Sequence, residues 1–149
     1  MNFEERINAE LKTAMLAKDE ASVRGLRAIK QSILMAKTSG AATMSAEDEI
    51  KMLQKLVKQR KESVEIYQQQ NRPDLAKPEL EEISVIEKFL PKQMDEAEIR
   101  SELKRIIAEA GASSPQDMGK VMGAASKFFA GKADNKIVSG LVKELLAGN

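Results

Sequence analysis

Residues 46–70, AEDEIKMLQKLVKQRKESVEIYQQQ, are expected to form the longest helix of the chain. The seam positions of this helix alternate three and four residues apart and comprise Ile50, Leu53, Val57, Arg60, Val64 and Tyr67. Such alternation is typical of a helix that packs lengthwise against a partner helix. Ser45, followed three residues later by Asp48, resembles a capping box at the start of a helix. This stretch therefore favours an all-α fold.

After this helix the chain is expected to turn back. The tripeptide Asn71-Arg72-Pro73 stops the helix, because the residue before a proline avoids helical backbone angles. A second helix is expected over residues 74–90, with Pro78 in its first turn, where a missing N–H is least harmful. Its apolar face comprises Leu80, Ile83, Ile86 and Leu90. So short a connection predicts an antiparallel helical hairpin.

Two further helices are expected before this hairpin. The first covers residues 3–17, and its apolar row, with a spacing of four, comprises Phe3, Ile7, Leu11 and Met15. The second covers residues 20–37 and can be capped by Asp19. Its stripe comprises Ser22, Leu26, Ile29, Ile33 and Ala36. A loop of small residues is expected to follow, over residues 38–44.

The dipeptide Leu90-Pro91 marks the expected domain boundary. Three shorter helices should follow it, and the residues that open or close them are Asp95, Gly111, Ser114, Pro115, Gly131 and Asp134. The sequence thus predicts an all-α, multihelical architecture with two domains. Residues 1–90 would form a helical domain that contains the long antiparallel hairpin, and residues 91–149 would form a three-helix domain.

The composition excludes several classes of function. The 149 residues include no His and no Cys, which excludes imidazole catalysis, thiol nucleophiles and structural zinc sites. We expect no metal and no other cofactor. The net charge is only +1, so no overall field attracts the chain to a polyanion. Because no apolar run is long enough for a bilayer and no signal peptide is expected, we predict a cytoplasmic protein.

No catalytic motif was found in the sequence. The nucleophile elbow G-x-S-x-G, the Walker A loop and the dinucleotide fingerprint G-x-G-x-x-G are all missing. The stretch Gly111-Ala112-Ser113-Ser114 is rich in serine, as amidase sites are, but Ser114-Pro115 is better explained as a helix start. We therefore assign no catalytic residue.

Three arginines allow two interpretations. Arg27, Arg60 and Arg72 could gather as an anion site, since guanidinium groups match phosphate and carboxylate oxygens. Arg60 could instead pair with a carboxylate such as Glu79 or Glu82 while its stem packs in the seam, and we favour this interpretation. The nearby basic run is interleaved with glutamates and is expected to be a solvated helix face; it comprises Lys55, Lys58, Arg60 and Lys61.

The C-terminal region contains two glycine–lysine segments, GKVMG at residues 119–123 and GKAD at residues 131–134. Gly119 and Gly123 lie on one face of the helix that is expected to begin at Ser114-Pro115. Each glycine weakens this helix by up to about 1 kcal/mol relative to Ala. Either another helix packs closely on this face, or the face lets a nucleic-acid backbone approach the main chain. The sequence leaves both alternatives open. Lysines outnumber acidic residues here, which is the electrostatic footprint of a modest phosphate contact.

These two segments, followed by VKELL at residues 142–146, resemble the C-terminal signature of the GatB/YqeY family. Further similarity to YqeY proteins occurs upstream, at residues 58–63 (KQRKES), Tyr67, residues 71–75 (NRPDL) and residues 89–91 (FLP). The resemblance covers essentially the whole chain. Asn71 stands where the family usually has glycine, a difference that alters the hairpin turn and not the function.

The resemblance implies a two-domain, all-α fold and similarity to the tail domain of GatB, a subunit of the tRNA-dependent amidotransferase. That enzyme amidates Glu-tRNA(Gln) or Asp-tRNA(Asn) with glutamine as the amide donor, and its tail domain contacts the tRNA. The family is associated with carbon–nitrogen ligase activity with glutamine as amido-N-donor. Because activation, amide transfer and glutamine hydrolysis belong to other domains, the resemblance implies a tRNA-binding accessory module that is not catalytic alone.

The residues carried over as facing tRNA are Gly119, Lys120, Gly123, Gly131, Lys132 and Asp134. The partners implied by the resemblance are tRNA and either an amidotransferase or an aminoacyl-tRNA synthetase. The alternative is a helical scaffold that binds a protein through the seam of residues 46–70, without nucleic acid.

Overall fold

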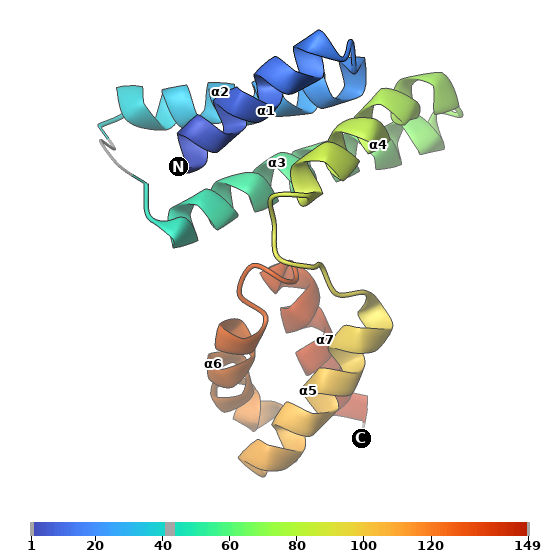
Figure 1. Ribbon diagram of the computed structural model, residues 1–149. Coiled ribbons are helices and arrows are strands. Elements are labelled where there is room, and N and C mark those ends of the chain that lie inside the picture. Colours follow the sequence, from blue (N-terminus) through green and yellow to red (C-terminus); the bar gives the residue numbers. More distant parts are fainter. Residues whose placement is uncertain (1, 41–43, 149) are drawn as a thin grey trace. The chain divides into compact units, whose positions relative to one another are not determined.

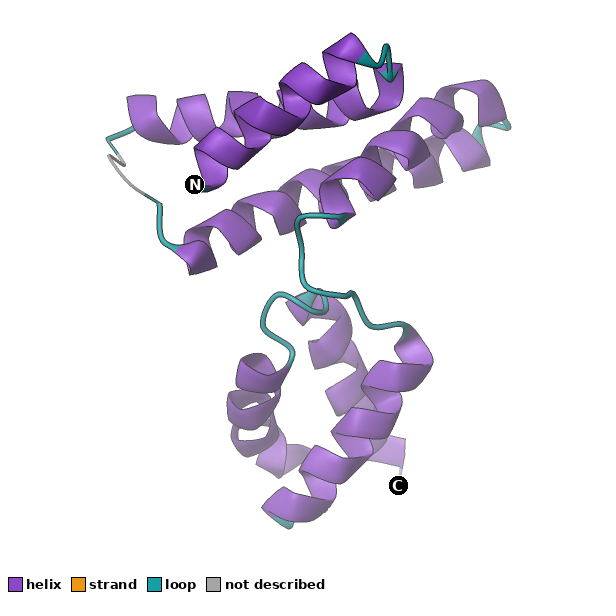
Figure 2. Ribbon diagram, viewed as in Figure 1, coloured by secondary structure: helices purple, strands orange, loops and turns teal. Residues whose placement is uncertain are grey.

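The structure is a computed structural model that describes residues 2–40 and 44–148. All regular secondary structure over these residues is helical, which confirms the all-α prediction (Figure 2). The helices are α1 (Phe3–Leu16), α2 (Glu20–Thr38), α3 (Ala46–Gln69), α4 (Pro73–Glu87), α5 (Glu96–Ala110), the 3-10 helix η1 (Pro115–Asp117), α6 (Met118–Phe128) and α7 (Asn135–Gly148). Part of the expected small-residue loop, residues 41–43, lies outside the described residues.

The helices form two compact units, one ending at Pro91 and the other beginning at Lys92, and each has its own hydrophobic cluster. In the first unit, α1 pairs with α2, α3 pairs with α4, and α2 packs on α4 (Figure 1). The second unit packs α5, α6 and α7 together. The antiparallel pairing of α3 with α4 confirms the hairpin prediction.

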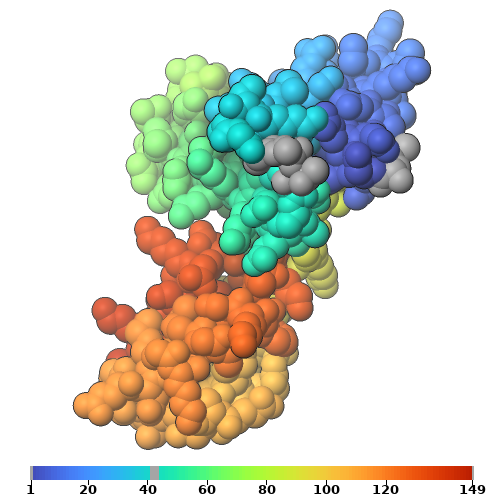
Figure 3. All heavy atoms as spheres, turned by 90° about the vertical axis from the view of Figure 1, so that its left-hand side faces the viewer, coloured from blue at the N-terminus to red at the C-terminus, as the bar shows by residue number. Residues whose placement is uncertain are grey.

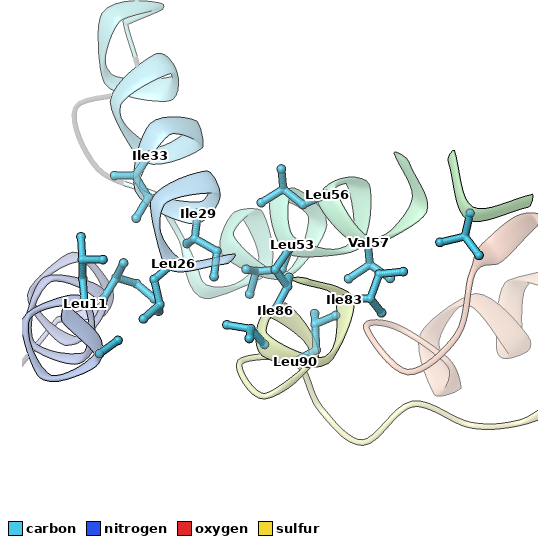
Figure 4. Close-up of a cluster of buried hydrophobic side chains, with 14 of the residues drawn as sticks. Leu11, Leu26, Ile29, Ile33, Leu53, Leu56, Val57, Ile83, Ile86 and Leu90 are labelled. Carbon is cyan, nitrogen blue, oxygen red and sulfur yellow. The ribbon is translucent and has the colours of Figure 1, made fainter. Parts of the chain in front are cut away.

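The seam of α3 is covered within its own unit. Leu53, Val57 and Val64 are buried. They belong to the hydrophobic cluster partly shown in Figure 4, to which α4 contributes Ile83 and Ile86. These seam positions are therefore not available to a partner protein. The scaffold alternative assumed that a protein binds at this seam, so the burial of these residues argues against it.

A glycine allows the close approach of α2 to α4. A Cβ atom placed on Gly25 would lie 2.7 Å from Cγ1 and 2.8 Å from Cβ of Val85. Val85 is buried, and its β-branched side chain has few alternative rotamers. It cannot move aside without disturbing the core. The sequence pattern around Gly25 gives no sign of this contact, because Val85 lies on a helix that is distant in the sequence.

The turn between α3 and α4 contains a residue with a left-handed backbone conformation. Asn71 has a φ of 58°, which Asn tolerates better than most residues other than Gly. The amide of Arg72 donates a hydrogen bond to the carbonyl of Tyr67 at 2.8 Å and closes the end of α3. Asn71 therefore suits a turn position where the family usually has glycine.

The prediction for Pro78 was wrong. Pro73, and not Asp74, occupies the first helical position of α4, so Pro78 lies in the second turn. The physical reason is that the φ angle of proline is already suited to a helix start, which moves the start ahead of Asp74. Pro78 then removes one i→i−4 hydrogen bond inside the helix.

Two residues predicted on apolar faces, Met15 (52%) and Leu80 (48%), are about half exposed, and so is Ile137 (51%). Met15 lies in the last turn of α1 and Ile137 in the first turn of α7. Hydrophobic periodicity places a side chain on one face of a helix, but it does not say how far a neighbouring helix covers that face. The structure thus leaves these side chains at the surface.

Candidate nucleic-acid interface

Three of the predicted residues belong to α6, which lies on the side of the second unit that is turned to the viewer in Figure 3. Gly119, Lys120 and Gly123 are all exposed. A Cβ atom placed on either glycine would meet no atom within 4 Å. Close helix packing is therefore wrong as the explanation of the two glycines, and over the described residues the outer face of α6, which carries them, is open.

The sequence of α6 explains why this face points outward. Val121 and Ala125 are fully buried on the opposite side and hold the helix on the core of the second unit. Lys127 is also exposed. Its spacing of four from Gly123 and seven from Lys120 places it on the open face, although the family resemblance did not include it. The helix contains no acidic residue, so the two lysines give this face a positive charge.

A capping interaction marks the start of the 3-10 helix η1, which directly precedes α6. The carboxylate of Asp117 accepts hydrogen bonds from the backbone amides of Ser113 at 3.0 Å and Ser114 at 3.3 Å. These bonds lower the pKa of Asp117, and the charge of Lys120 contributes to the shift. Unlike the prediction, the first turn after Ser114 is a 3-10 helix, and α6 itself begins at Met118.

The second predicted segment forms the loop between α6 and α7. Gly131 is buried with a φ of 76°, and its carbonyl accepts a hydrogen bond from Nε2 of Gln93 at 2.7 Å. The carboxylate of Asp134 accepts a hydrogen bond from the amide of Lys136 at 2.9 Å and thereby caps α7. Gly131 and Asp134 thus have structural roles in this loop and do not lie on the open face of α6.

Lys132 lies beyond the C-terminal end of α6, away from Gly119 and Lys120. Its carbonyl accepts a hydrogen bond from the amide of Met94 at 2.9 Å, and its Nζ lies 4.9 Å from the centroid of the Phe128 ring. At 1.5 Å per residue, about 12 Å of helix lies between Lys120 and Phe128. The structure therefore brings together the three predicted residues of α6 and places Lys132 beyond the other end of the helix.

The pairing of Arg60 confirms the interpretation that we favoured. Its Nε lies 3.5 Å from Oε1 of Glu82, and both side chains are mostly buried. Arg72 instead donates two hydrogen bonds to the carboxylate of Asp74 at an exposed turn, at 3.0 and 2.9 Å. Because each arginine is engaged by its own carboxylate, the two do not form an anion site. Arg27 is exposed on α2.

Glu79 of α4 is influenced by the charges of Glu82 and Arg60. Burial raises the pKa of Glu79 and the negative charge of Glu82 adds to the rise, whereas Arg60 opposes it.

Among residues 2–40 and 44–148, no three acidic side chains gather in a way that could hold a metal ion. Within the same ranges, no helix has both the length and the apolar character that a membrane span requires.

These observations define a helical protein with a positively charged, glycine-lined face and without a recognisable catalytic motif. The family model described as Yqey-like protein matches residues 4–146. The chain therefore belongs to the YqeY-like family, as the resemblance in its sequence indicated.

Three fungal proteins, each named altered inheritance of mitochondria protein 41, mitochondrial, are similar to this chain. The protein of Clavispora lusitaniae is 36% identical over 110 residues, which cover 72% of this chain and 64% of that protein. The protein of Lachancea thermotolerans is 32% identical over 115 residues, with coverages of 73% and 60%. That of Pyrenophora tritici-repentis is 27% identical over 145 residues, with coverages of 95% and 79%. The chain thus spans less than two thirds of the first two relatives.

Proposed function

We propose that this protein is a tRNA-binding accessory module and that the outer face of α6 contacts the tRNA backbone. The observation that carries the proposal is the open surface over Gly119 and Gly123. Without a Cβ atom at these positions, a phosphodiester chain can approach the helix backbone. Lys120 and Lys127 stand on the same face as compact cations for phosphate oxygens. α6 itself contains no acidic residue, and the carboxylate of Asp117, whose charge interacts with Lys120, precedes the helix.

The amidotransferase connection is part of the same proposal and rests on the family resemblance alone. The module would serve a complex that has carbon–nitrogen ligase activity with glutamine as amido-N-donor, and it would not catalyse the reaction alone. Its protein partner would be an amidotransferase or an aminoacyl-tRNA synthetase. We propose a cytoplasmic location, whereas the names of the three fungal relatives place those proteins in mitochondria.

The test is a filter-binding titration with tRNA at several salt concentrations. Replacing Lys120 and Lys127 together with Ala should remove two phosphate contacts. The slope of log K against log salt should then fall by about 1.4–1.8, at about 0.7–0.9 per contact. The matched control replaces Lys51 and Lys55, which are also exposed but lie on α3, and should leave the slope unchanged.

Two further variants locate the contact more finely. Gly123→Ala adds a methyl group to the open face and should weaken tRNA binding, without lowering the free energy of unfolding. Lys132→Ala should change the slope less than Lys120→Ala, because the ammonium group of Lys132 lies over an aromatic ring. An unchanged tRNA affinity of the Lys120/Lys127 double variant at low salt would overturn the assignment to α6.

A further inference from the structure

The turn from α1 into α2 lies at one end of the first unit (Figure 1). Residues on both sides of this turn line a cleft. Its lining combines an apolar part with charged groups and comprises Met15, Lys18, Glu20, Val23, Arg24 and Arg27. The turn is tight, because Lys18 takes a left-handed φ of 57° and Asp19 is already engaged in capping α2 at Ser22. None of these residues has a role in the tRNA proposal.

The apolar part of the cleft is exposed. Met15 ends the apolar row of α1 and is 52% exposed, and the next residue, Leu16, is 78% exposed. Met15 therefore leaves apolar surface in the cleft that a partner's side chain can cover. The unbranched thioether of Met15 can adapt to the shape of an aliphatic side chain.

The charged part of the cleft is predominantly positive, with three cations and the single carboxylate of Glu20. Arg24 is already paired with carboxylates of α4, at 3.7 Å from Glu81 and 4.0 Å from Glu82. Lys18 is exposed and takes part in no ion pair formed by the described residues. Arg27 is exposed and takes part in none of the ion pairs formed by the described residues. The cleft therefore retains donors for an incoming carboxylate.

We propose that this cleft binds an acidic, aliphatic segment of a partner protein, such as an amphipathic helix with carboxylates beside its apolar face. An aliphatic side chain of the partner would lie against Met15, and its carboxylates would face the exposed cations Lys18 and Arg27. Electrostatic complementarity of this kind selects the partner's charge. A nucleic acid fits less well, because the lining contains no aromatic ring on which a base could stack.

The experiment uses the full chain and a synthetic probe. The probe is a fluorescein-labelled, 16-residue amphipathic peptide with Leu on one face and Glu on its flanks, and a matched peptide carries Lys in place of every Glu. Anisotropy titrations at low salt should show binding of the acidic peptide only. Arg27→Glu should weaken this binding about fivefold, through lost attraction and added repulsion. Met15→Ser should weaken it by about tenfold, through lost apolar contact.

Matched controls separate the cleft from general surface effects. Lys58→Glu reverses an exposed charge on α3, and Met35→Ser removes a methionine of α2 that is 64% exposed. Both should bind the acidic peptide like the wild type. The proposal is overturned if the acidic peptide does not bind, if the basic peptide binds equally well, or if the controls weaken binding as much as the cleft variants. It is also overturned if Arg27→Glu lowers tRNA affinity instead, which would make the cleft an RNA surface.

Discussion

Replacing Gly25 with Ala is expected to destabilise the first unit, although alanine is the better helix former. In an exposed helix interior this substitution stabilises by about 0.8–1.0 kcal/mol. At Gly25 the new methyl group would lie 2.7 Å from Cγ1 and 2.8 Å from Cβ of Val85. Forcing an extra methyl group into a packed core costs about 1–3 kcal/mol. The expected net effect is a loss of about 1 kcal/mol in the free energy of unfolding.

Gly123→Ala supplies the matched control, because Gly123 and Gly25 are both the sixth residue of their helices. No atom lies within 4 Å of a Cβ at Gly123, so only the propensity gain should appear. This variant should be more stable by about 0.5–1 kcal/mol. Subtracting the two effects removes the propensity contribution and leaves the steric conflict of α2 with α4, which is expected to be about 1–3 kcal/mol.

The measurement is denaturant unfolding followed by two signals. Tyr67 is the only tyrosine and the chain has no tryptophan, so tyrosine fluorescence reports on the first unit, whereas circular dichroism reports on all helices. Gly25→Ala should lower the midpoint of the fluorescence transition, and Gly123→Ala should leave it unchanged. Val85→Ala should cost less stability in the Gly25→Ala background than in the wild type, because there the removal of Cγ1 also relieves part of the steric conflict. If Gly25→Ala gains as much stability as Gly123→Ala, the inferred contact with Val85 is refuted.

Three further outcomes are expected. A fragment of residues 92–149 should be helical and melt cooperatively, with marginal stability for its size; a coil spectrum by circular dichroism would show that the domain boundary is misplaced. The pKa of Asp117 is lowered in the folded protein, so its capping interaction stabilises the fold fully at pH values above the ordinary carboxyl pKa of about 3.9. This stabilisation is lost as the pH falls through the pKa that Asp117 has in the folded protein. In Asp117→Asn, the free energy of unfolding should therefore decrease less at acid pH than it does in the wild type. An identical decrease for both proteins in urea titrations would contradict this account. The isolated protein should release no ammonia from glutamine above a blank, and a clear excess from material free of amidotransferase would reveal a catalytic site.

Features that depend on neighbouring residues were predictable from the sequence. The capping boxes of Ser45 with Asp48 and of Asp95 with Glu98 are present, and Gly111 ends α5 with a φ of 67°. Each involves groups within four residues, so the order of residue types is sufficient to reveal it. The hairpin of α3 and α4 followed similarly, because a short turn forces two helices with apolar faces to pack against each other.

For the candidate site, the sequence indicated that α6 has an unusual glycine face, but it could not show whether that face was covered. Lys120 and Lys132 looked equivalent in the two glycine–lysine segments. The structure distinguishes them, because Lys120 is exposed on the helix whereas the ammonium of Lys132 lies 4.9 Å from the centroid of the Phe128 ring. Likewise, Glu79 and Glu82 were equal candidates to pair with Arg60, and the packing of α3 on α4 brings Glu82 to 3.5 Å.

The sequence alone thus determined that the chain is helical, where most helices start and end, and that it belongs to the YqeY-like family, because these depend on local residue order. Only the tertiary structure decided what lies against each helix face. Gly25 and Gly123 show the difference, since both are mid-helix glycines flanked by apolar periodicity. A Cβ atom placed on Gly25 would lie 2.7 Å from Val85, whereas a Cβ atom placed on Gly123 would meet open space. Whether a side chain contacts a distant helix depends on how the helices pack, and hydrophobic periodicity does not specify how closely two helices approach each other.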